Sequence, residues 1–198
     1  MRVLEYKIKG KKSQYQAIDE VILTTQFVRN KALRHWMDAP RELKIDRFAL
    51  NRYSTELRNE FGFVKDLNSM AVQSAAERAW VSISRFYDNC KSGKPGKKAH
   101  ESAVRLCLPQ NSRKGGFPKF RKHRTNLSVE YKTCGWKLSN DRLTITFTDG
   151  FEAGAFRLWG TRDRLGKSPS AGGPCYRGFP LHFYQIEQIK RVRVVRPC

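Results

Sequence analysis

The sequence predicts an α+β fold in which a small β-barrel or curved sheet carries an inserted helical unit. Residues 13–91 repeat apolar side chains in steps of three or four, which is typical of amphipathic helices. Residues 3–9 and the region after residue 126 form short runs with strand character between turn signals. We expect the first strand to pair with the later ones, so that the helices are an insertion between strands of one sheet.

The first two elements follow directly from these periods. Residues 3–9 alternate between apolar and polar side chains and predict a half-buried strand. Ser13 and Gln16 have the spacing of a capping box, so we expect a helix that opens there and runs to about Met37. Pro40 cannot continue a helix and ends the pattern.

Two more helices complete the helical unit. One covers about residues 47–59, with Asp46 placed as the N-cap residue that accepts a hydrogen bond from a free backbone amide. Gly62 interrupts the pattern after it. The third helix begins at Asn68 or Ser69, both of which suit an N-cap, and runs for about twenty residues to a stop signal rich in Gly and Pro.

The chain changes character after the third helix. Residues 97–116 have no clear period and predict a basic linker, whereas residues 160–180 are rich in Gly, Pro, Ser and Arg and predict a long loop. Strands are predicted at residues 127–133, 136–138, 142–148, 156–159 and 186–196. The expected domains are residues 1–10 as the first barrel strand, 11–96 as a helix-turn-helix-like domain, 97–116 as the linker and 117–198 as the remaining barrel.

The charge of the chain points to an anionic partner. Its 198 residues carry a formal net charge of +21, and a hydrophobic fraction of 39% is compatible with a folded core. Such a surplus repels itself in a compact state unless an anionic partner offsets it. Nucleic acid is the leading partner. Anionic membrane is the alternative, although no apolar run approaches the length that crosses a bilayer.

Other classes of function find no support in the sequence. The N-terminus lacks the apolar core of a secretory signal. The five cysteines show no C-x-x-C pair and no ligand spacing, and the His, Asp and Glu residues form no catalytic constellation. We therefore expect a cytoplasmic protein with no catalytic residue, no metal site, no cofactor, no membrane partner and no small-molecule substrate.

A basic and aromatic stretch, residues 115–125, is the main candidate for binding. Its cations alternate with Phe and His side chains, so the charges can neutralise phosphates while rings stack on bases. A solvated surface loop is the alternative. The candidate phosphate-binding residues are Lys119, Arg121, Lys122 and Arg124, together with Lys132 in the next strand region and Arg191 and Arg193 on the last strand.

Gln73, near the start of the third helix, is a candidate for reading bases. A Gln side chain can form two hydrogen bonds with adenine. The alternative is that Gln73 is only a solvent-facing helix former.

Four stretches of the chain, in this order and spacing, resemble the amino-terminal half of TnpB (OrfB-type) proteins encoded by bacterial insertion sequences. They are residues 27–33, 68–75, 92–94 and 116–122. Members of that family are RNA-guided DNA endonucleases, and they are also described as transposases with an N-terminal helix-turn-helix. The resemblance covers most of the chain and rests on the combination of motifs.

The resemblance implies a more specific fold and partners. The family pairs a β-barrel wedge domain with an inserted three-helix recognition lobe, and together these hold a guide RNA and read a short motif beside a double-stranded DNA target. A bacterial cytoplasmic location is implied, with association with the nucleoid as an option. By similarity, Gln73 takes the place of a motif-reading Gln, and Ser54 on the second helix is a weaker candidate.

The chain also departs from the family. The nuclease half of the family contributes a G-x-D-x-G strand, three acidic metal ligands and a zinc ribbon with four cysteine ligands, and the sequence ends before any of these. Residues 99–112 and 164–180 interrupt the family-like sequence, as degraded coding sequence would. We therefore expect a truncated binding portion that is not an enzyme. The alternatives are a stand-alone helix-turn-helix regulator of DNA and a non-functional remnant.

Overall fold

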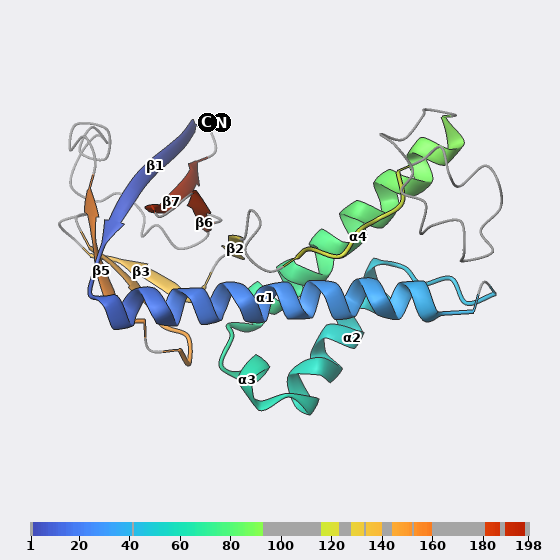
Figure 1. The fold of residues 1–198 in the computed structure, drawn as a ribbon, viewed down its shortest axis with the longest axis horizontal. Helices are drawn as coiled ribbons and strands as arrows, with labels where there is room; N and C mark the ends of the chain where they lie inside the picture. The colour runs from blue at the N-terminus through green and yellow to red at the C-terminus, as the bar shows by residue number, and fades with distance from the viewer. Residues whose placement is uncertain are drawn as a thin grey trace.

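The protein is described here from a computed structural model, which covers residues 2–40, 42–92, 116–122, 128–132, 134–139, 144–151, 153–159, 181–186 and 189–196. Within these ranges four helices and seven strands form an α+β fold (Figure 1). The predicted fold class is therefore confirmed at this level.

The helices lie close to the predicted ranges. They are α1 (Lys12–Asp38), α2 (Arg47–Glu60), α3 (Gly62–Lys65) and α4 (Ser69–Lys91). The short α3 was not among the predicted helices, because its four residues are too few to show a helical period.

The sequence identifies two of the three expected helix caps. Asp46 accepts a hydrogen bond from the Ala49 amide at 2.7 Å, and Asn68 accepts one from the Met70 amide at 2.9 Å. The predicted capping box at Ser13 is wrong. Gln14 caps α1 instead, and its Oε1 accepts from the Lys11 amide at 2.8 Å.

Gln14 also ties α1 to the sheet, which explains why the helix begins where it does. Its Nε2 donates to the carbonyl oxygens of Ala153 and Ala155, both at 2.9 Å. A local sequence pattern cannot reveal these two partners, since they lie about 140 residues away.

The strands form one antiparallel sheet in the order β2-β6-β7-β1-β5-β4-β3. Their bounds are β1 (Arg2–Lys9), β2 (Ser128–Tyr131), β3 (Trp136–Leu138), β4 (Thr144–Phe147), β5 (Ala155–Trp159), β6 (Leu181–Ile186) and β7 (Ile189–Arg196). The first strand sits in the middle of the sheet, between β7 and β5, which confirms that it joins the later strands. The helices are inserted after it in the chain.

Two features of the sheet differ from the prediction. The single closing strand expected at 186–196 is a hairpin of β6 and β7, whose register runs from Leu181 opposite Val194 to Ile186 opposite Ile189. No hydrogen-bonded ladder between described residues joins the edge strands β2 and β3, so the sheet is open and not a closed barrel. These edge strands have four and three residues, which leaves few backbone groups for a closing ladder.

The helices and the sheet share one hydrophobic core. Ile18 and Val21 of α1 and Leu67 before α4 pack in the same buried cluster as Ile145 of β4 and Phe156 of β5. A second cluster lies among the helices and includes Leu33 of α1, Leu50 of α2, and Ala76, Ala79 and Ile83 of α4. The helical unit therefore depends on the sheet for part of its burial.

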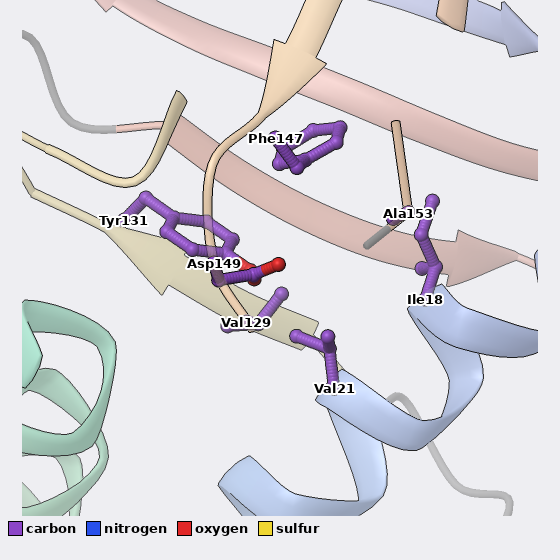
Figure 2. A pocket seen from close by; sticks show the side chains of 7 residues that line it. All are labelled: Ile18, Val21, Val129, Tyr131, Phe147, Asp149 and Ala153. Atoms are coloured by element: carbon purple, nitrogen blue, oxygen red, sulfur yellow. The ribbon is translucent and has the colours of Figure 1, made fainter. Parts of the chain in front are cut away.

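A small cavity marks the place where α1 meets the sheet. Figure 2 shows Tyr131 and Asp149 pointing toward one another beside Ile18 and Val21 of α1. Tyr131 is only 1% exposed, so it belongs to the core. Its hydroxyl donates a short hydrogen bond to Oδ2 of Asp149, while Oδ1 of Asp149 is buried without a partner among the described residues.

We expect the substitution Asp149→Asn to stabilise the protein at neutral pH but not in acid. Burial raises the pKa of Asp149, and the hydrogen bonds from Tyr131 and from the backbone amides of Phe151 and Asp149 offset this only in part. The folded state thus binds the proton more tightly than the unfolded state, and the stability this gives is lost as pH rises through the folded pKa. Asparagine can still accept the Tyr131 bond but carries no charge. Urea unfolding at pH 7 and pH 3.5 measures the difference, and an effect that does not change with pH would contradict this account.

Candidate nucleic-acid interface

The predicted basic stretch is held across two helices. Residues 116–122, which we call the basic segment, run as extended chain along α4 and beside α1 (Figure 1, yellow trace). Phe117 lies between the two helices, with its ring centroid 5.6 Å from that of Trp36 on α1 and 5.4 Å from that of Phe86 on α4. The buried Pro118 follows it. One end of the basic segment is thus fixed by aromatic packing.

Side chains of α1 hold the other end by its backbone. Asn30 forms a two-way pair with Arg121: its Nδ2 donates to the Arg121 carbonyl at 3.0 Å, and its Oδ1 accepts from the Arg121 amide at 3.1 Å. Gln26 donates to the same carbonyl at 2.5 Å, and Arg29 donates to the Lys119 carbonyl at 3.4 Å. These side chains supply the partners that a neighbouring strand would give to extended backbone.

This mode of attachment leaves the cationic side chains on the surface. Because α1 binds the backbone of the basic segment, the side chains of Lys119, Arg121 and Lys122 remain exposed. Phe120 between them is 43% exposed, whereas Phe117 is packed against the helices. The structure therefore brings three of the predicted cations and one aromatic ring together on a fixed stretch of chain.

An arginine that sequence reasoning missed lies beneath the basic segment. Arg29 is 7% exposed, and its Nη2 donates to Oγ of Ser82 on α4 at 3.3 Å. Among the residues that the structure describes, no carboxylate pairs with it. Burial lowers the pKa of Arg29 to about 10, and the charges of Arg121 and Arg78 act in the same direction. The available signal was a cation within the buried stripe of α1, next to Val28 and Ala32.

Glu77 of α4 has two predicted candidates near it. Gln73 precedes it by one turn on the same helix, and Lys132, just after β2, pairs with it. Glu77 accepts from Lys132 and from Arg47, each at 2.6 Å. Burial opposes ionisation of Glu77, but these two hydrogen bonds outweigh it and lower its pKa. Lys132 therefore already has an anionic partner within the protein. Gln73, one turn before Glu77, is half-buried on α4.

Ser54 does not lie on a binding surface. It is 3% exposed, and its hydroxyl donates to the Asn51 carbonyl within α2 at 2.7 Å. Ser54 falls between Leu50 and Leu57 on the buried face of the helix. Its candidacy as a contact to DNA is therefore wrong for this fold, because helical spacing places it with the core residues.

The remaining candidates are placed only in part. Arg124 lies outside the described residues. Arg191 and Arg193 belong to β7, at register positions opposite Lys7 and Glu5 of β1. The structure thus places them on a central strand of the sheet.

Within the described ranges there is no candidate for a metal site or for a membrane-spanning helix. No group of three or more His, Cys, Asp or Glu side chains there could hold a metal ion. No helix in this part of the chain is long and apolar enough to cross a membrane.

Comparisons of the chain with protein-family models and with curated proteins gave no match.

We expect the substitution Asn30→Ala to loosen the basic segment without unfolding the protein. It removes both hydrogen bonds to the Arg121 backbone, each worth about 0.5–1.5 kcal/mol. Trypsin should then cut after Lys119 and Arg121 faster, by about 5- to 150-fold if both bonds count fully. Mass spectrometry of timed digests identifies these cuts.

Asn59→Ala is the matched control, since Asn59 is exposed on α2. Equal cutting rates in the wild type and both variants would show that Asn30 does not hold the basic segment.

Proposed function

We propose that this chain binds nucleic acid through the basic segment and its surroundings on α1 and α4. The observation that carries the proposal is the attachment of the basic segment by its backbone, which leaves Lys119, Arg121 and Lys122 exposed in a fixed row. Cations spaced along an extended chain suit the regular charges of a phosphate backbone, and their binding releases counterions. The exposed ring of Phe120 adds a surface on which a base can stack.

The net charge supports the same partner. A chain with formal net charge +21 needs anions nearby to relieve self-repulsion. Some of its carboxylates are already used within the fold, since Glu77 pairs with Lys132 and Arg47, and Glu130 lies 3.4 Å from Arg78. The large positive surplus therefore favours a partner that brings its own negative charge.

We further propose that the chain is a TnpB-type protein portion that holds guide-type RNA and contacts double-stranded DNA in the bacterial cytoplasm. The resemblance of four stretches to that family supports this, and two of them contact one another: residues 27–33 supply Arg29 and Asn30, which bind the backbone of residues 116–122. In this proposal the sheet corresponds to the wedge barrel and the helices to the recognition lobe. The proposed role is binding, with no step of catalysis, metal or cofactor chemistry.

Replacing the exposed cations should weaken binding and reduce its dependence on salt. For the triple variant Lys119→Gln, Arg121→Gln and Lys122→Gln, the slope of log K against log salt should fall by about two to three, at about 0.7–0.9 for each phosphate that is no longer neutralised. Fluorescence anisotropy with labelled RNA and duplex DNA, over a range of salt concentrations, measures both quantities.

The control carries the same change in charge elsewhere on the protein. Lys44→Gln, Arg52→Gln and Lys65→Gln alter three exposed residues before, within and after α2. If the two triple variants lose affinity equally, the basic segment is not the site and only the net charge matters.

A stand-alone regulator that reads duplex DNA is the second candidate. It is favoured by Gln73, whose side chain makes no hydrogen bond to any residue that the structure describes and so keeps its amide for a base. On this candidate, Gln73→Ala should abolish preference for one DNA sequence while leaving non-specific binding intact. A bidentate pairing of this type is worth about 1–3 kcal/mol of discrimination between bases.

Competition binding with a randomised duplex library, with and without RNA co-purified from the expressing cells, separates the two candidates. Sequence preference that appears without RNA and is lost in Gln73→Ala supports the regulator. Preference that requires RNA supports the TnpB-type proposal.

A further inference from the structure

We propose that Arg29 and Arg121 form a phosphate-binding site at the junction of α1, α4 and the basic segment. The favoured ligand is a phosphate group of a nucleic-acid backbone, and in that respect the inference rests on the proposed function.

Arg29 is buried, and no carboxylate among the described residues pairs with it. Its hydrogen bonds go to neutral oxygen atoms: Oδ1 of Asn30 at 3.3 Å, the Lys119 carbonyl at 3.4 Å and Oγ of Ser82 at 3.3 Å. A buried guanidinium normally has an anionic partner, because removal from water disfavours its charge. Arg29 has none among the described residues, so an external anion would complete its surroundings.

The basic segment crosses directly over Arg29. Asn30, which accepts from Arg29, is bound to the backbone of Arg121, and Arg29 itself donates to the Lys119 carbonyl. The buried guanidinium of Arg29 therefore lies against the stretch of chain that carries Arg121.

The charges of these arginines act on one another. After burial, the positive charges of Arg121 and Arg78 are the causes that lower the pKa of Arg29. Arg78 stays outside the site, because its side chain pairs with Glu130 at 3.4 Å and donates to the Ser128 carbonyl at 2.7 Å. The fold thus holds like charges close together, which is unfavourable in the free protein and favourable around a bound anion.

The position of each arginine gives it a different part in the site. Arg121 is exposed, whereas Arg29 is 7% exposed and donates to the Lys119 carbonyl of the basic segment. An anion at the basic segment would meet the Arg121 side chain at the surface, with the charge of Arg29 beneath the backbone. Asn30 and Ser82 keep the Arg29 guanidinium in place before the anion arrives.

The chemistry favours phosphate over a carboxylate. Guanidinium groups match the oxygen atoms of a phosphate through paired hydrogen bonds, and several of them can contact one phosphate from different sides. Lys119 and Lys122 continue the positive charge along the basic segment, which fits a polymer of phosphates better than a single anion.

Two variants test the site. Arg29→Met removes the buried charge, and Arg121→Gln removes the exposed one while its backbone keeps both bonds to Asn30. The second variant tests the site even if the first fails to fold. Arg52→Gln, on the exposed face of α2, is the control with the same loss of charge.

Binding of a labelled single-stranded RNA is measured by anisotropy over a range of salt concentrations. We expect each site variant to bind several-fold more weakly than the control, with a salt slope reduced by about one. In parallel, thermal unfolding is followed with sodium pyrophosphate and with sodium chloride at the same ionic strength. Pyrophosphate should raise the Tm of the wild type and the control more than chloride does, and it should lose this effect in the site variants.

The outcomes separate this inference from the proposed function. If the wild type binds RNA but the site variants match the control in both affinity and slope, the site is overturned and nucleic-acid binding stands. If RNA does not bind but pyrophosphate still raises the Tm through Arg29 and Arg121, the site stands as one for free phosphate and the proposed function fails. If neither ligand acts, both fail.

Discussion

The structure depends on α1, because this helix is packed into both hydrophobic clusters. Its first half, with Ile18 and Val21, packs in the core shared with the sheet, and its second half, with Ala32 and Leu33, packs between α2 and α4. The middle of the helix, between these two cores, carries Gln26, Arg29 and Asn30, whose side chains bind the basic segment. A helix of 27 residues held at both ends gives this middle portion a fixed position.

The same packing determines how the excess positive charge is distributed. Where α4 meets α2 and the end of β2, carboxylates neutralise the cations, as Glu77 does for Arg47 and Lys132. Where α4 meets α1 and the basic segment, the buried Arg29 is held by neutral Asn30 and Ser82, close to the exposed cations of that segment. One face of α4 is thus held together by ion pairs, whereas another concentrates positive charge that an outside anion would offset.

Much of the fold was predictable from local pattern. The three long helices, the caps at Asp46 and Asn68, and the strands at β3 and β5 follow from period and composition, since these signals lie within a few residues of the elements they specify. The errors arose where residues far away in the sequence determine the local structure. Gln14 caps α1 and also binds the Ala153 and Ala155 carbonyls, which no local pattern reveals. The sheet stays open, although Tyr131 of one edge strand packs against Phe147 of the strand beside the other edge.

Periodicity and charge are properties of the chain alone, and they were enough to establish the fold class, the order of elements and the basic character of residues 116–122. Tertiary contacts decided which candidate residues can meet a ligand. These contacts buried Ser54, paired Lys132 with Glu77, and placed Arg29 beneath the basic segment. Burial and partner choice depend on elements far apart in the chain, so no local pattern contains them.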